Sequence, residues 1–161
     1  MAADAATDTV PSMRVGVIAD THGQLRPRVL ELLQGCDRIL HAGDVGTAAV
    51  LAELRRVAPV LAVRGNVDDG PVVRDLPAVL HDDLDGVRLQ MVHRREDADP
   101  RDHGLGLVVF GHSHRPELQY QGSCLLLNPG ACGPRRFSYP LTLAVLTIEG
   151  RRLQPEILRV E

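Results

Sequence analysis

Two histidines stand two positions apart in Gly111-His112-Ser113-His114, directly after the apolar run 107–110. Such a pair can bind a metal, act as the base for a nucleophile, or simply provide polar side chains at the mouth of a strand. The tetrapeptide alone leaves all three alternatives open. The side chains that follow the other apolar runs narrow the choice.

Six apolar runs are each followed by polar side chains. In chain order these are Asp20 and His22, Asp44, Asn66, His93, His112 and His114, and Asn128. A single Asp or Asn at a strand end commonly caps a helix or forms a turn. Histidine is a poor N-cap, however, and capping does not account for the whole set. Open α/β sheets bind ligands beyond the carboxyl ends of their strands, so we expect these side chains to converge.

The converging side chains combine carboxylate and amide oxygens with imidazole nitrogens and contain no thiolate. This donor set suits Mn²⁺, Fe, Zn²⁺, Ni²⁺ or Co²⁺ better than a cysteine-rich zinc site or an all-oxygen calcium site. The set is too large for one tetrahedral metal with an open position, but it suits two metals that share a carboxylate. Two metals about 3.5–4 Å apart are typical of phosphoester hydrolases.

The elements that must position these residues follow a βαβαβ pattern in the first half of the chain. Strands are predicted at 15–19, 38–41, 60–63, 87–92, 107–110, 124–127 and 141–148, and helices at 26–34 and 47–57. Alternating strands and helices indicate a parallel sheet with helices packed on it. After residue 70, shorter strands (79–80, 118–121) and Gly-containing turns indicate mixed or antiparallel sheet.

Composition limits the classes of protein. The chain has 161 residues, 44% hydrophobic and 24% charged, which is typical of one globular domain; we predict a disordered leader at 1–12 and a single domain at 13–161. The net charge of −3 gives no indication of nucleic-acid binding, and no apolar stretch reaches the length of a membrane span. The dispersed cysteines and the lack of a signal peptide favour a cytoplasmic location.

The motifs Asp20-Thr-His22-Gly, Gly43-Asp44, Gly65-Asn66, strand-terminal His93 and Gly111-His112-Ser-His114 resemble, in order and spacing, those of the calcineurin-like metallophosphoesterase superfamily. The tail 127–150 is similar to the compact YfcE-type phosphodiesterase branch, so the resemblance covers nearly the whole chain. It implies an α/β fold, a four-layer α/β/β/α sandwich of two mixed sheets.

The resemblance also implies which residues hold each ion. Asp20, His22 and His114 would bind the first metal; Asn66, His93 and His112 would bind the second; Asp44 would bridge both. Mn²⁺ is the expected ion, with Fe, Ni, Co or Zn as alternatives. The expected reaction is hydrolysis of a phosphodiester by in-line attack of a metal-bound hydroxide, with Asp44 and Asn66 as catalytic residues. The Asn66 amide would donate to a phosphoryl oxygen.

Two departures from the family pattern affect the chemistry. Many larger relatives have a histidine after the Asn, which can protonate the leaving group, whereas this chain has Val67. General acid catalysis contributes roughly 10²–10⁴-fold, so we expect a preference for good leaving groups. Asp68 is the nearest substitute, although a turn or supporting role is expected. The segment between His93 and His112 is too short for a long helix and predicts a more open rim, with His103 as a fallback ligand.

Four further residues are candidates for binding substrate. Arg94, Arg115, Arg135 and Asn128 adjoin ligand positions or the Asn-Pro-Gly turn, although each arginine could equally be a solvated loop residue. His41 lies within an apolar run, where it is expected to pack or to orient a ligand. A small phosphoester is the expected partner, and a homodimer is one expected assembly. The alternative function is a scaffold like the retromer subunit, but retention of every ligand type favours an enzyme.

Overall fold

The structure, a computed structural model, describes residues 11–99, 104–136 and 138–161. His103 and most of the predicted leader lie outside these residues. β1 (Ser12–Ile18) begins one residue before the predicted start of the domain, and Ser12 pairs with Glu149. Within the described ranges, no helix is long and apolar enough to cross a membrane.

Sheet A has five strands in the order β10-β9-β1-β2-β3. They are β1, β2 (Arg38–His41), β3 (Val60–Ala62), β9 (Thr142–Glu149) and β10 (Arg152–Arg159). β1, β2 and β3 are parallel and are connected through α2 (Pro27–Leu32) and α3 (Ala48–Arg55), so the predicted βαβαβ unit is confirmed. β9 and β10 extend the sheet in antiparallel fashion.

Sheet B has five strands in the order β4-β5-β6-β8-β7. They are β4 (Val79–Leu84), β5 (Val87–Val92), β6 (Leu105–Val109), β7 (Glu117–Gln121) and β8 (Cys124–Asn128). β5, β6 and β8 are parallel, whereas β4 and β7 form antiparallel edges. Asp85 and Gly86 both have positive φ, as a two-residue type I′ hairpin turn requires, and this turn sets the register of β4 on β5.

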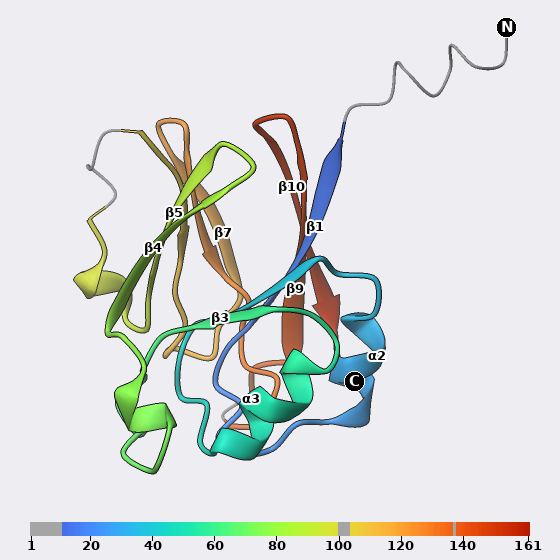
Figure 1. Ribbon diagram of the computed structural model, residues 1–161, viewed down its shortest axis with the longest axis vertical. Helices are drawn as coiled ribbons and strands as arrows, with labels where there is room; N and C mark the ends of the chain where they lie inside the picture. The colour runs from blue at the N-terminus through green and yellow to red at the C-terminus, as the bar shows by residue number, and fades with distance from the viewer. Residues whose placement is uncertain (1–10, 100–103, 137) are drawn as a thin grey trace, which may run out of the picture.

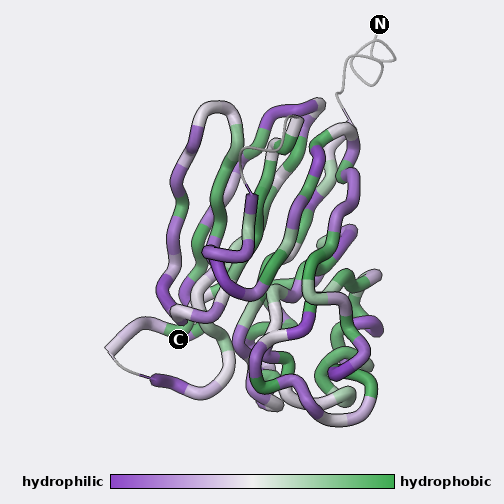
Figure 2. Tube along the Cα trace, turned by 90° about the vertical axis from the view of Figure 1, so that its left-hand side faces the viewer, coloured by the Kyte–Doolittle hydropathy of each residue, from purple (hydrophilic) through white to green (hydrophobic). Residues whose placement is uncertain are grey.

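The two sheets face each other, with both helices against sheet A (Figure 1). The core between the sheets is built from alternate strand residues such as Val17, Leu40, Leu89 and Leu107, all essentially inaccessible to solvent. A second cluster lies between sheet A and the helices, where Val50, Leu51 and Leu54 form the buried face of α3. Figure 2 shows hydrophobic residues running along the strands of this sandwich. The predicted α/β sandwich of two mixed sheets is confirmed.

The outer layer on sheet B is reduced. Between β5 and β6 the described residues contain only the 3₁₀ turn η2 (Arg95–Asp97), because the connection is too short for a full helix. The Arg95 guanidinium lies 5.7 Å from the centre of the Phe110 ring and donates to Glu117 and Gln119 of β7. On the outer face of sheet B, a short segment held by Arg95 takes the place of the helix layer that the four-layer sandwich implies. The short spacing from His93 to His112 predicts this reduced connection.

β10 was not among the predicted strands because Pro155 interrupts its apolar pattern. Proline removes a ladder donor and is tolerated on edge strands, which is the position of β10 in sheet A. Leu153 and Ile157 pack against the core between the sheets, so burial of alternate side chains stabilises the strand despite the proline.

Candidate metal centre and active site

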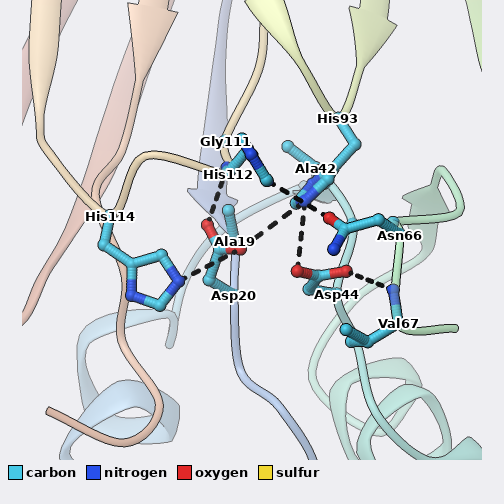
Figure 3. Close-up of polar contacts among 12 residues, drawn as sticks. Ala19, Asp20, Ala42, Asp44, Asn66, Val67, His93, Gly111, His112 and His114 are labelled. Carbon is cyan, nitrogen blue, oxygen red and sulfur yellow. Dashed lines mark hydrogen bonds and ion pairs between the residues drawn. The ribbon is translucent and has the colours of Figure 1, made fainter. Parts of the chain in front are cut away.

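The carboxyl ends of the parallel strands in both sheets meet at one end of the sandwich (Figure 3). Two groups of potential ligand atoms gather there. The first is Asp20, His22 and His114, and the second is Asp44, His93 and His112; within each group the atoms lie within 4.8 Å of one another. The structure therefore brings together residues from both halves of the chain, as the strand-end pattern predicts.

Asp20 is fully buried and presents one oxygen to three imidazoles. Its Oδ1 lies 3.6 Å from His114 Nε2 and 3.8 Å from both His22 Nε2 and His93 Nε2. These distances exceed hydrogen-bond length, and Oδ1 has no hydrogen-bond partner among the described residues. The other oxygen, Oδ2, accepts a hydrogen bond from the His112 N–H at 3.0 Å, which fixes the carboxylate plane.

Asp44 belongs to the second group but also faces the first, and its carboxylate is held in the same way as that of Asp20. Its Oδ1 accepts a hydrogen bond from the Val67 N–H at 3.0 Å, and its Oδ2 is turned toward the imidazoles. Oδ2 lies 3.7 Å from His22 Nε2 and 3.2 Å from His93 Nε2, one residue of each group. This position is the one that a carboxylate shared by two ions would require.

The remaining donors are also oriented. His93 Nδ1 donates to the Ala42 carbonyl at 2.7 Å, so its Nε2 faces Asp44. A histidine ligand commonly has its second nitrogen bonded in this way. Asn66 Oδ1 lies 3.2 Å from His112 Nδ1, which places the amide oxygen beside the second group. His22 and His114 approach each other, with 3.4 Å between their Nε2 atoms.

The electrostatics of the first group fit a cation. Burial raises the pKa of Asp20 to about 7, and a cation bound beside it would stabilise the ionised carboxylate. Burial lowers the pKa of His22 and brings that of His114 to about 4, so both imidazoles are neutral at pH 7. Neutral imidazoles and a carboxylate oxygen that accepts no hydrogen bond, here Asp20 Oδ1, are ligands that Mn²⁺, Fe or Zn²⁺ bind.

In the second group, the contacts of Asp44 and His93 outweigh the effect of burial on the pKa values of these two residues. Burial opposes ionisation of Asp44, but the contact with His93 and the Val67 N–H outweigh it and lower the pKa of Asp44 to about 2. The same contact raises the pKa of His93 above its usual value, although burial acts in the opposite direction. Before an ion binds, His93 and Asp44 therefore partly neutralise each other, and the donor set fits a second divalent cation that would replace the imidazole proton.

A layer of hydrogen bonds behind the ligands holds their loops. His41 is fully buried, with its Nε2 2.9 Å from Thr21 Oγ1 and its Nδ1 accepting from the Gly43 N–H. Thr21 Oγ1 donates to the Val45 carbonyl, so the ring links the loop after β1 to the loop after β2. Burial lowers the pKa of His41 to about 3, so the ring is neutral and positions the loops, which matches the supporting role expected for it.

Asp68 joins the loops that carry Asp44 and Asn66. Its carboxylate accepts hydrogen bonds from the backbone N–H groups of Val45, Gly46 and Gly65 at 2.8–3.1 Å. The carboxylate is therefore turned away from the ligand atoms, consistent with the turn role expected for Asp68. Val67, which follows Asn66, is 45% exposed at the rim.

The ligand positions adopt an unusual backbone conformation. Asp20, His22, Asp44, His112 and His114 all have φ between +47° and +74°, in the left-handed region. Non-glycine residues in this region cost about 1–2 kcal/mol each, and such strain is concentrated at functional sites. Two glycines allow the close approach of the loops. A Cβ at Gly65 would lie 2.1 Å from Asp44 N, and one at Gly111 would lie 3.0 Å from Asp20 Oδ2.

Three of the four predicted substrate residues have their described contacts away from the ligand atoms. Asn128 is fully buried, donates to the Gly111 carbonyl and Ser113, and accepts from the Gly130 N–H, so it supports the His112–His114 loop instead. The Arg135 guanidinium pairs with the Glu161 carboxylate. Arg115 lines a separate hollow beside β7. The described contacts of Asn128 and Arg135 therefore support loops and the chain end, and substrate binding by these three residues stays a prediction of the sequence.

Arg94 differs, because it lines a pocket together with Asn66 and His93. Two other arginines were missed by the sequence analysis. Arg64 lines the same pocket. The charge of Arg136 opposes the larger effect of burial on the pKa of Asp20, and it adds to the lowering of the pKa of His22 and His114. Arg64 lies two residues before Asn66, and this adjacency was an available signal. No local feature distinguishes Arg136 from its neighbour Arg135.

Residues 13–151 match the Calcineurin-like phosphoesterase superfamily domain, and the chain belongs to this superfamily. A protein of Methanothermobacter thermautotrophicus named "Probable metallophosphoesterase" is 32% identical over 161 residues, covering 91% of this chain and 92% of that protein. The family resemblance inferred from the strand-end motifs is therefore confirmed.

Solved structures have the same fold. An archaeal phosphodiesterase superposes with a TM-score of 0.75 at 21% identity, covering 91% of this chain and 100% of that one. YfcE, a phosphoesterase from E. coli, gives 0.65 at 23% identity, covering 92% and 100%. Vacuolar Protein Sorting 29 from Cryptosporidium parvum gives 0.75 at 17% identity, covering 91% and 97%. At these identities the likeness establishes the fold, which both enzymes and sorting proteins share.

Proposed function

We propose that this chain is a phosphodiesterase that depends on two divalent metal ions. The observation that carries the proposal is the position of Asp44 Oδ2, which lies within 3.7 Å of an imidazole of each ligand group. A structural metal site has no need of two adjoining groups around one carboxylate. When bound, two such ions lower the pKa of a water molecule and neutralise charge on a phosphoryl group. Mn²⁺ is the ion we propose.

The residues of this chain then have separable roles. Asp20, His22 and His114 would hold one ion, and Asn66, His93 and His112 the other. Because Asn66 Oδ1 faces the second group, the Nδ2 amide is available to donate to a phosphoryl oxygen. The charge of Arg136 acts on the first group and would attract the phosphate.

The rim favours diesters with good leaving groups. Val67 cannot donate a proton to a departing alkoxide, and the Asp68 carboxylate is engaged by backbone amides. Aryl esters need little protonation because their leaving groups are stable anions. The name of the archaeal structural relative, a phosphodiesterase, also supports a diester substrate.

The test compares bis-4-nitrophenyl phosphate with 4-nitrophenyl phosphate, with Mn²⁺ present and after chelation. We expect turnover of the diester with Mn²⁺, loss on chelation, and loss of turnover and of one or both bound ions in Asp44→Asn. Asp82→Asn, at an exposed position on edge strand β4, is the matched control and should retain both. Diester turnover that survives in Asp44→Asn would refute the proposal.

The alternative function is a metal-binding or protein-interaction scaffold, for which the fold shared with Vacuolar Protein Sorting 29 is the supporting observation. The same experiment separates the two functions. A scaffold would retain metal in the wild type and hydrolyse neither ester. A cytoplasmic location and a homodimer remain predictions of the sequence, which fractionation and light scattering would check.

A further inference from the structure

A pocket adjoins the second ligand group. Its lining comes from the end of β3, the segment before β4 and the segment after β5, and it has a volume of about 220 Å³. The lining residues are Arg64, Gly65, Asn66, Ala78, His93, Arg94 and Asp97, hereafter the arginine pocket. Since Asn66 and His93 belong to the candidate metal centre, anything bound in this pocket lies next to the reacting phosphate.

The charged groups of the arginine pocket are mainly cationic. One N–H of Arg64 donates to the Arg74 carbonyl at 3.2 Å, which positions the side chain and leaves the other guanidinium donors for a ligand. Within the described part of the chain, the Arg94 guanidinium has no hydrogen-bond or ion-pair partner. Asp97 contributes one opposing carboxylate. A guanidinium has forked donors that match a carboxylate or phosphate group, and two of the residues lining this pocket carry one.

The arginine pocket's volume of about 220 Å³ lies below the range of about 300–1,000 Å³ that is usual for sites enclosing a whole small molecule. It suits a substituent of the phosphoester. We infer that the substrates of this protein are phosphodiesters in which one ester arm carries a second anionic group, and that Arg64 and Arg94 bind this group. The inference rests on the proposed phosphodiesterase function and specifies its substrate class.

The inference is tested with three diesters that share a 4-nitrophenyl leaving group. The arm that stays on phosphorus is ethyl, 2-carboxyethyl or choline, so the arm is neutral, anionic or cationic. With Mn²⁺ we expect kcat/KM to be about tenfold higher for the carboxyethyl ester than for the ethyl ester, and lowest for the choline ester, with the difference mainly in KM. Equal values for the three arms would overturn the inference while leaving the proposed function intact.

Variants then identify the residues responsible. Arg64→Gln and Arg94→Gln should each reduce the ratio of carboxyethyl to ethyl kcat/KM, and the double variant should bring it close to one. Asp97→Asn should raise this ratio, because it removes the opposing charge. Arg152→Gln, at an exposed position on β10, is the matched control and should leave the ratio at the wild-type value. A ratio that persists in the double variant would contradict the assignment.

Binding provides a readout that does not depend on turnover. Calorimetric titration with 2-carboxyethyl phosphate and with ethyl phosphate compares the same two arms on a monoester. We expect about tenfold tighter binding of the carboxyethyl compound by the wild type and equal binding by the double variant. If no diester is hydrolysed but this difference appears, the proposed activity fails while the anion pocket stands. Equal binding of the two compounds by the wild type refutes the pocket.

Discussion

Gly65→Ala should disable the centre although Gly65 itself contributes no ligand atom. A Cβ at this position would lie 2.1 Å from both Asp44 N and Asp44 Oδ1, and 2.8 Å from Asp44 Cα. Two of these three atoms are backbone, so no side-chain rotation relieves the clash. The loop of Gly65 is also tied to the loop of Asp44 through Asp68, which bonds the Gly65 and Val45 amides. The loops must therefore separate against their own hydrogen bonds.

The size of the effect follows from the distances. To reach an ordinary contact of 3.4 Å, the two loops must move apart by about 1.3 Å. Misplacement of reacting groups by about 1 Å can cost 10²-fold in rate. Overpacking of this kind typically costs about 1–3 kcal/mol, and each kcal/mol lowers Tm by about 2–4 °C in a domain of this size. We expect kcat on bis-4-nitrophenyl phosphate to fall at least 100-fold, with Tm lower by about 2–12 °C.

The assay measures kcat, Mn²⁺ content and Tm for Gly65→Ala and for Gly70→Ala. Gly70 lies in the same loop, and a Cβ there meets nothing within 4 Å, so this variant should behave like the wild type. Activity is measured well below the Tm of each variant, and circular dichroism checks the fold. Wild-type kcat in Gly65→Ala, or an equal loss in Gly70→Ala, would refute the argument that close approach of the Gly65 backbone builds the centre.

Three further predictions concern the pH dependence of Asp20, the hydrogen bonds by which Asp68 holds the loops, and the leaving group of the substrate. Because the pKa of Asp20 is raised to about 7, a metal ion must displace a proton from Asp20 at lower pH. Mn²⁺ affinity, measured by titration, should therefore decrease by about tenfold per pH unit below pH 7. An affinity independent of pH between 5 and 7 would contradict this. The stability of the metal-free protein depends on pH in the opposite direction, because the folded protein holds a proton on Asp20 that the unfolded chain releases. Asp20 therefore favours folding below about pH 4, and this contribution is lost as pH rises through 7. Asp68→Ala removes three hydrogen bonds from backbone N–H groups to the carboxylate and should lower the unfolding free energy, measured by denaturant titration, by about 3 kcal/mol or more. A loss below 1 kcal/mol would show that the loops keep their positions without Asp68. Val67→His should increase kcat for dimethyl phosphate about tenfold or more but leave kcat for methyl 4-nitrophenyl phosphate nearly unchanged, because only the alkoxide leaving group of dimethyl phosphate needs a proton. Equal gains for the two substrates would argue against a leaving-group role.

The sequence by itself determined which residues meet. Carboxylate, amide and imidazole side chains follow successive apolar runs, and parallel strands place their carboxyl ends at one edge. The convergence of Asp20, Asp44, His93 and His112 could be predicted because this rule depends only on strand position and direction. The hairpin turns at Asp85-Gly86 and Gly122 could likewise be predicted, because these residue types adopt the positive φ that such turns require.

Only the tertiary structure determined how the loops beyond the strands are turned. Local sequence does not distinguish Arg135, which pairs with Glu161, from Arg136, whose charge acts on Asp20. The Asp68 carboxylate and the Asn128 amide serve backbone groups at 45–46 and 111. The physical reason is that strand ends are set by local periodicity and pairing direction. The orientation of a loop side chain depends instead on hydrogen bonds and charges from segments distant in the chain, and the arginine pocket beside Asn66 is built from such segments.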